Sequence, residues 1–405
     1  MDVRILKGRF TGQVKVYTYN LKERVSHMET NLEKIMGCLY GGAVGDALGY
    51  PIEFRRAEEI FAIYGEKGIS SYELFHGKAL ISDDTQMTLF TANGLLVGYT
   101  RLCLRGIMGP WQSYIESAYK DWLKTQNDSY CSEIPYCSSW LLNCKELYSN
   151  RAPGNTCLSA LCSKECGSID NRINNSKGCG GIMRIAPIGL YLPRHINSIR
   201  KIDVIGAEAA AITHGHPLGF IPAAALTHII ARCVISEDSL ELIVKEAIQT
   251  AAELFRYEKH IEEFTAIMDR AIRFANEEME DMTAIRELGE GWVAEETLAI
   301  AVYCALKYQK DFEKGVVASV NHDGDSDSTG AVTGNILGAY LGIDSIPNKF
   351  IEPLELKDVI GELAVDMYED CKMSEYGNYR DEKWMQKYVT GQYDGRRQEN
   401  TNGNE

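Results

Sequence analysis

An all-α fold is predicted by three features of this sequence. From residue 31 onward, apolar residues recur at the three- and four-residue spacing of buried helix faces over most of the chain. Strand signals between these segments are few and short. With 45% hydrophobic and 24% charged residues and no Pro-, Gly- or Ser-rich linker, the 405-residue chain can bury a large core without disulfides. We therefore expect an all-α globule whose functional residues lie at helix ends and in loops.

The first predicted helix follows Asn31. Ile35, Leu39, Ala43 and Ala47 fall at helical spacing, and the glycines between them would let another backbone approach closely. Comparable apolar periodicity predicts further helices at residues 87–102, 111–123, 204–213, 221–234, 240–255, 261–277, 293–308, 329–341 and 356–369.

The two ends of the chain differ from this helical body. Residues 1–27 carry six basic and two acidic residues, a net +4, and the alternation over residues 14–19 is typical of a small β-hairpin. A basic arm suits docking onto an acidic surface of this protein or of a partner. The alternatives are a frayed extension or a true start at Met28. We expect a single domain at residues 28–394 and a disordered polar tail at residues 395–405.

Charge and cysteine usage exclude several classes of protein. The formal net charge of −15 argues against general binding to nucleic acids, which requires a basic surface. The 12 cysteines are scattered, several in apolar or Gly-rich helical segments, which indicates reduced, buried thiols. Cys131 with Cys137 and Cys162 with Cys166 lack the Cys-x-x-Cys spacing of zinc modules. Because the first ten residues lack an apolar signal core and no uncharged apolar stretch reaches 18 residues, we expect a cytoplasmic protein without a membrane partner.

Two short acidic stretches with hydroxyl residues carry the clearest chemistry. They are Ser82-Asp83-Asp84-Thr85 and, about 240 residues later, Asp325-Ser326-Asp327-Ser328-Thr329. Each precedes a run of small and apolar residues, so each is also a plain helix start with a capping side chain. Capping needs one such group, whereas both stretches supply three or more. Together they would offer oxygen ligands to two hard cations, magnesium or manganese rather than zinc, which can orient a polyol and activate a water.

Weaker motifs lie elsewhere in the chain. Residues 289–294 match the dinucleotide fingerprint Gly-x-Gly-x-x-Ala by letter, but no strand is predicted before them. Residues 176–181 precede an apolar helix, and their free N–H groups would cradle an anion such as pyrophosphate or form a plain helix-entry loop. His214 and His216 end an Ala-rich helix, where histidines usually cap the helix or lie in the core.

Taken in order, these segments resemble the ADP-ribosylglycohydrolase family, the dinitrogenase-reductase-activating type of hydrolase. The similarity extends over roughly residues 31–390. The matching segments are Gly37 to Gly49, Glu53, Ser82 to Thr85, Arg151 to Thr156, Lys177 to Arg184, Thr213-His214 and His322 to Gly330. The resemblance implies a compact all-α fold, an orthogonal multi-helix bundle, with two magnesium or manganese ions in a central cleft. It places the metal ligands at Ser82, Asp83, Asp84, Asp325, Asp327 and Ser328.

The same resemblance implies the substrate-binding residues and the reaction. Glu53 would lie beside the ribose, and the pyrophosphate and distal ribose would be held by Ser176, Gly178, Cys179, Gly180, Gly181 and His214. Cys179 is a departure, because some relatives carry Asn at this position. The implied reaction hydrolyses the bond from C1 of the terminal ribose to a modified side chain, through a transition state that resembles an oxocarbenium ion. A carboxylate would handle the proton, and the candidates are Asp83, Asp84 and Glu53.

Several interpretations of function stay open at this point. The motifs describe only the ADP-ribose side, so the modified residue of the protein substrate is arginine, serine or another acceptor. We favour arginine because the chain is more similar to the bacterial branch of the family than to the serine-directed one. A second interpretation is an immunity protein that occludes an ADP-ribosylating toxin through residues 1–27, with or without hydrolysis. A third is an inactive relative, which the intact acidic stretches disfavour.

Overall fold

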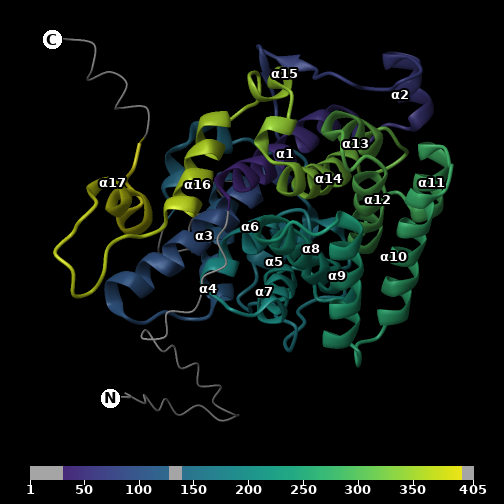
Figure 1. Ribbon diagram of the computed structural model, residues 1–405. Helices are drawn as coiled ribbons and strands as arrows, with labels where there is room; N and C mark the ends of the chain where they lie inside the picture. The colour runs from purple at the N-terminus through teal and green to yellow at the C-terminus, as the bar shows by residue number, and fades with distance from the viewer. Residues whose placement is uncertain (1–30, 127–138, 395–405) are drawn as a thin grey trace.

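The predicted all-α fold is confirmed by the structure, a computed structural model that describes residues 31–126 and 139–394. The described residues form seventeen α-helices and one two-stranded ribbon (Figure 1). The predicted hairpin within residues 1–27 and the tail at residues 395–405 lie outside the described residues, so the predicted domain boundaries stay predictions. The helices are α1 Leu32–Gly49, α2 Ala57–Tyr64, α3 Asp83–Arg105, α4 Trp111–Gln126, α5 Asn155–Leu161, α6 Ala186–Tyr191, α7 Ile199–Ala211, α8 Pro217–Ile235, α9 Leu240–Leu254, α10 Ile261–Asn276, α11 Asp281–Leu288, α12 Ala294–Lys307, α13 Phe312–Val320, α14 Ser326–Leu341, α15 Asn348–Ile351, α16 Lys357–Glu369 and α17 Glu382–Met385.

All ten helices predicted from periodicity are present, and four of them, α3, α7, α8 and α14, begin three to five residues earlier than predicted. α3 begins at Asp83 and α14 at Ser326, in place of residues 87 and 329. Both first turns are polar, so the apolar periodicity starts only behind them. Asp83, Asp84 and Asp327 therefore lie within the first helical turns, whereas Asp325 is the residue before α14. The ribbon of β1 (Leu74–Phe75) and β2 (Lys78–Ala79) lies between α2 and α3.

A glycine-lined contact between α1 and α14 sets the position of the site. The two helices run antiparallel and touch through their backbones, because Gly45 faces Gly330, and Gly41 faces Gly334. A Cβ atom built on Gly45 would lie 2.0 Å from the carbonyl oxygen of Gly330, which no side chain tolerates. Figure 1 shows the two helices side by side in the middle of the molecule. This contact brings the end of α1 next to the beginning of α14, where the second acidic stretch lies.

Asp46, which is buried in α1, fixes the beginning of α3. One carboxylate oxygen of Asp46 accepts the backbone N–H of Ser82 at 3.0 Å, and the other accepts the N–H of Thr85 at 3.1 Å. Thr85 also donates its hydroxyl to the same carboxylate. The first turn of an α-helix has four N–H groups without helical partners, and Asp46 satisfies two donors at this one. α1 therefore holds the start of α3 through Asp46 and the start of α14 through its glycines.

α8 is the one described helix that is long and apolar enough to cross a membrane by length and composition. Within this helix, 89% of the most apolar 18-residue stretch is buried inside the protein. Leu218, Phe220 and Leu226 are part of the hydrophobic core. The burial of α8 is that of a core helix.

The cysteines of the described residues are all free thiols. Most are buried, as their positions in apolar segments predicted. Cys162 is exposed and Cys166 is partly buried. Cys131 and Cys137 lie outside the described residues.

Candidate functional site

The two acidic stretches meet in the structure as the first turns of α3 and α14. Ser82, Asp83 and Asp84 are buried at the start of α3, and Asp325 and Asp327 are buried at the start of α14, all with at most 4% of their surface exposed. The charge of Asp327 acts on both Asp83 and Asp84, so the two stretches lie close together. Because both helices direct their N-termini at this point, the partial positive charges of two helix dipoles converge on the carboxylates.

Capping explains some of these side chains but not all of them. Ser82 is the N-cap of α3 and accepts the N–H of Asp84, and Asp325 is the N-cap of α14 and accepts the N–H of Ser328 at 3.2 Å. Asp83 accepts the N–H of Gly154 at 3.3 Å. One carboxylate oxygen of Asp84 is buried without a hydrogen bond from any described residue. A buried, unpartnered carboxylate oxygen is costly, so Asp84 exceeds the needs of a helix cap.

Glu53 lies with the second acidic stretch. Its carboxylate oxygen lies within 4.8 Å of oxygens of Asp325 and Asp327, the one such group of potential metal ligands in the described part of the chain. The Oε2 atom of Glu53 is also buried without a hydrogen-bond partner among the described residues. From the sequence, Glu53 was expected to lie beside the ribose and to be a candidate for proton transfer, but not to be a metal ligand. Its position adds a further oxygen that can reach a cation.

The carboxylates of the site repel one another. Burial, followed by the negative charge of Asp327, raises the pKa of Asp83 and Asp84 well above the ordinary value. The same two causes raise the pKa of Asp46 to about 7 and, with Asp325, that of Glu53 to about 10. None of the groups that shift these pKa values most is a lysine or an arginine of the described chain. The buried carboxylates therefore carry an excess of negative charge, which bound divalent cations can balance.

The donor atoms fit magnesium or manganese. Carboxylate and hydroxyl oxygens from two helix starts are hard ligands, and the two unpartnered oxygens of Asp84 and Glu53 leave coordination capacity unused. One sulfur atom borders this oxygen cluster, because the Sγ of Cys179 donates a hydrogen bond to Oδ2 of Asp325 at 2.8 Å. Burial and the charge of Asp325 raise the pKa of Cys179, so the thiol is neutral and donates a hydrogen bond. A neutral thiol is a poor metal ligand.

The Gly-rich loop at residues 176–181 is less free than its sequence indicated. The N–H of Cys179 donates to the carbonyl of Trp292 at 3.1 Å, and the N–H of Gly178 donates to the hydroxyl of Ser176 at 3.4 Å. The predicted cradle of free N–H groups therefore does not include these two. A Cβ on Gly180 would lie 2.9 Å from the Sγ of Cys157 and 3.2 Å from the ring of His214, so a glycine here lets both side chains approach the loop.

The two histidines have the roles that their positions indicated. His216 caps α8 by accepting the N–H of Leu218 at 3.0 Å. His214 is buried, and its Nδ1 lies 2.8 Å from the hydroxyl of Thr213. Burial, followed by the charge of Arg184, lowers the pKa of His214 to about 3. The imidazole is therefore neutral and can offer a hydrogen bond beside the Gly-rich loop, but no charge.

Residues 289–294 do not form a dinucleotide-binding loop. They connect α11 to α12, whereas the fingerprint requires a strand before it. Gly291 packs against Asp325, and the carbonyl of Glu290 accepts the N–H of Asp325 at 2.8 Å. This loop therefore belongs to the acidic site, which the sequence pattern did not reveal.

Some residues that hold the start of α3 in place were not identified from the sequence. Asp46 is one, and its position in an apolar, glycine-rich helix was a usable sign, because a carboxylate there needs partners. The other is the buried pair of Arg151 and Glu355. Arg151 donates to the carbonyl of Ile81, the residue before the first acidic stretch, at 2.9 Å. No local pattern predicts a partner for Arg151 that lies 204 residues away.

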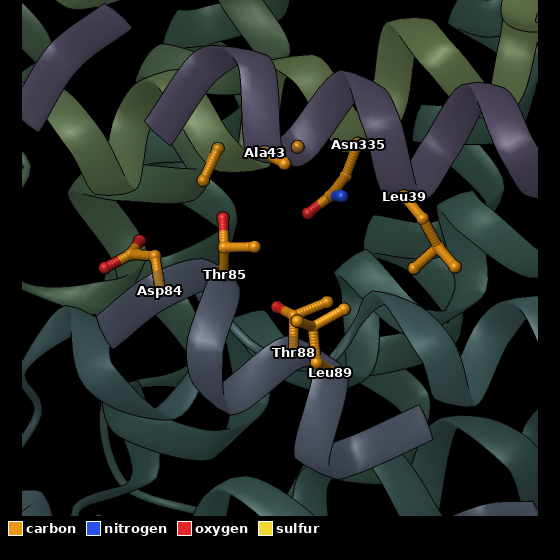
Figure 2. A pocket seen from close by; sticks show the side chains of 9 residues that line it. Leu39, Ala43, Asp84, Thr85, Thr88, Leu89 and Asn335 are labelled. Carbon is orange, nitrogen blue, oxygen red and sulfur yellow. The ribbon is translucent and has the colours of Figure 1, made fainter. Parts of the chain in front are cut away.

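A small cavity lies behind the first acidic stretch, between α1, α3 and α14. Its volume of about 10 Å³ is that of a single water molecule. Figure 2 shows Thr85, Thr88 and Asn335 at this cavity, with the carboxylate of Asp84 turned away from it. The cavity is too small for a substrate. The acidic site formed by the starts of α3 and α14 lies on the other side of Asp84.

Comparisons with known proteins agree with this arrangement. The sequence profile of the ADP-ribosylglycohydrolase family matches residues 27–376. An uncharacterized protein of Archaeoglobus fulgidus is 27% identical over 83% of this chain and 96% of its own length. The ADP-ribosyl-dinitrogen reductase glycohydrolase of Rhodospirillum rubrum is 24% identical over 80% of this chain and 91% of its own. A solved ADP-ribosylglycohydrolase-related protein complex has the same fold, with a TM-score of 0.53 and 22% identity over 85% of this chain and 99% of that one.

The fold and the two acidic helix starts define an all-α protein with a buried acidic site. The chain belongs to the ADP-ribosylglycohydrolase family, because the family profile covers most of its length. Membership supports the hydrolysis of ADP-ribosyl groups.

Proposed function

We propose that this protein is a cytoplasmic hydrolase that removes ADP-ribose from a modified arginine side chain of a protein. Two divalent cations, magnesium or manganese, would be held by Ser82, Asp83, Asp84, Asp325, Asp327 and Ser328. The observation that carries the proposal is the meeting of two buried acidic helix starts, where burial and the charge of Asp327 raise the pKa of Asp84. Family membership supplies the substrate class.

The side chains of the site would have different roles in the reaction. Bound divalent cations would polarise hydroxyl groups and lower the pKa of a bound water. Asp83 is held by the N–H of Gly154 and Asp84 by its helix start, so both are rigid supports for the terminal ribose. Glu53 follows a short 3₁₀-helix and has an unpartnered oxygen that faces the second acidic stretch. We assign the transfer of the proton to Glu53.

The overall reaction exchanges one bond for another. The bond from C1 of the terminal ribose to the guanidine nitrogen breaks, and a bond from C1 to a water oxygen forms. One proton of that water passes to the leaving nitrogen, so the products are ADP-ribose and an unmodified arginine. Ser176, the glycines of the Gly-rich loop and the neutral His214 would hold the distal part of ADP-ribose without adding charge.

An occluding immunity role has no support in the described residues. Residues 1–27, on which that interpretation depends, lie outside them. The hydrolase proposal depends only on residues that the structure describes.

The test is the release of ADP-ribose. Purified protein with magnesium or manganese is incubated with ADP-ribosyl-arginine and ADP-ribosyl-serine peptides, and free ADP-ribose is measured. We expect release from the arginine peptide that stops when a chelator is added. No release from either peptide would refute the proposed activity, and release from the serine peptide alone would correct the acceptor.

A matched pair of variants separates metal binding from helix capping. Asp325 and Asp311 are both N-caps that accept a backbone N–H, from Ser328 at 3.2 Å and from Lys314 at 3.1 Å. Because Asn also caps helices, Asp325→Asn and Asp311→Asn should differ little if capping is the only role. We expect Asp325→Asn to lower turnover by about 100-fold or more and Asp311→Asn to leave it unchanged.

A further inference from the structure

We propose that Phe54 and Trp292 form an aromatic platform at the mouth of the acidic site that binds the planar, cationic guanidinium of the acceptor arginine. This inference rests on the proposed function and names the residues that would select the acceptor. The two rings are stacked, with centroids 5.7 Å apart and an angle of 17° between their planes. Phe54 is 76% exposed and Trp292 is 36% exposed.

Both rings are attached to residues that contact the site. Phe54 follows Glu53, whose carboxylate lies within 4.8 Å of oxygens of Asp325 and Asp327. Trp292 follows Gly291, where an added Cβ would lie 3.4 Å from the carbonyl oxygen of Asp325. The platform is therefore one residue away from the acidic cluster on each of two separate segments.

Hydrogen bonds fix the two segments against each other. Asp323 accepts the N–H of Ala57 at 2.8 Å at the start of α2 and the side chain of Arg286 in α11 at 2.9 Å. Figure 1 shows α2 and α11 on the same side of the molecule. On the other segment, the carbonyl of Trp292 accepts the N–H of Cys179 at 3.1 Å. The rings are thus placed in advance, without a ligand.

Packing does not explain the platform. Neither Phe54 nor Trp292 belongs to the hydrophobic core or to the partly buried side chains that pack against it in the described part of the chain. Both side chains leave apolar area in water beside a cluster of carboxylates. Exposed aromatic groups that are rigidly held at the rim of a polar site are typical of a binding surface.

The chemistry of the platform favours a guanidinium. A guanidinium is planar and cationic, so it stacks on aromatic faces, whereas a serine hydroxyl gains nothing from them. Two nearby acidic residues add to the attraction, because Glu53 has an unpartnered oxygen that can accept a hydrogen bond and the carboxylate of Glu290 is only loosely paired with Arg56, at 3.9 Å. An ADP-ribosylated arginine keeps its positive charge. The platform lies beside Glu53 and would therefore face the leaving group.

The same rings could instead stack on the adenine of ADP-ribose, and the experiment separates the two ligands. Phe54→Ala and Trp292→Ala are compared with wild-type protein for hydrolysis of an ADP-ribosyl-arginine peptide and for binding of free ADP-ribose. We expect each variant to raise KM for the peptide about 10-fold while the Kd for ADP-ribose stays within about twofold. Phe54→Tyr and Trp292→Phe keep an aromatic face and should restore KM. Tyr376→Ala, which removes a ring that is 91% exposed elsewhere, should change neither value.

Each other outcome overturns the inference in a recognisable way. If KM and the Kd for ADP-ribose rise together, the platform binds adenine and not the acceptor. If wild-type protein is active and the alanine variants keep its KM, the platform binds neither. If wild-type protein releases no ADP-ribose from any peptide, the proposed function is refuted, and so is this inference, because it rests on that function.

Discussion

The glycine contact between α1 and α14 leads to a prediction about both stability and activity. In Gly45→Ala, the new Cβ would lie 2.0 Å from the carbonyl oxygen of Gly330 and 2.9 Å from the N atom of Ala331. Both are backbone atoms, so no side chain can rotate away. Real contacts of this kind are seldom shorter than 3 Å, and α1 and α14 would have to separate by about 1 Å.

Two opposing effects decide the size of the stability change. Alanine is a better helix former than glycine by about 1 kcal/mol, which favours the variant. Forcing a methyl group into a packed interior costs about 3 kcal/mol when the surroundings cannot yield. We therefore expect the free energy of unfolding to fall by about 2 kcal/mol. Gly109→Ala is the control, because its Cβ would meet only Tyr114, at 3.9 Å.

The same displacement should reach the metal ligands. Gly330 lies one turn behind Ser326 and Asp327, so moving α14 moves the second acidic stretch relative to the first. A displacement of about 1 Å in a catalytic site can cost about 100-fold in rate. Urea unfolding followed by tryptophan fluorescence measures the stability, and release of ADP-ribose measures the rate. If Gly45→Ala matches Gly109→Ala in both, the helices do not touch as described and the reasoning is refuted.

Three further predictions concern the charges of the site. Magnesium or manganese should raise the melting temperature of wild-type protein but not of Asp84→Asn, as differential scanning fluorimetry can test. Without cations, the protein should lose stability as pH rises from about 4 to about 7, because the folded state holds the proton of Asp46, whose pKa is raised to about 7, more tightly than the unfolded state does. Urea unfolding across this range in a chelator would show a flat profile if Asp46 and the other carboxyl groups of the site are not buried as described. Arg151→Lys should cost about 2 kcal/mol, because a lysine cannot bond both Glu355 and the carbonyl of Ile81 in the same geometry; an unchanged denaturation midpoint would contradict this.

The fold was predictable wherever a helix is long and has a clear apolar face. The long helices from α7 to α10 were identified from periodicity alone. Short helices such as α5 and α11 were not, because one or two turns do not display a period. The starts of α3 and α14 were placed too late for a related reason, since their first turns face a polar site and not the core.

The candidate site was predictable in its composition but not in its connections. The acidic stretches were visible because two separate segments carry more oxygen atoms than capping requires. The hydrogen bond from Cys179 to Trp292 and the pair of Arg151 and Glu355 join residues that are distant in sequence, so no local pattern contains them. Asp46 could have been found, since one carboxylate in an apolar helix demands an explanation.

The balance of charge at this point favours two cations over one. Six carboxylates gather around the helix starts and would carry six negative charges if all were ionised, and they are Asp46, Glu53, Asp83, Asp84, Asp325 and Asp327. The N-termini of α3 and α14 contribute roughly half a positive charge each, about one in total. One divalent cation would leave about three negative charges uncompensated in a buried site, whereas two would leave about one. That remainder is small enough for Glu53 to remove by holding a proton, which is the group the proposed reaction requires to carry one.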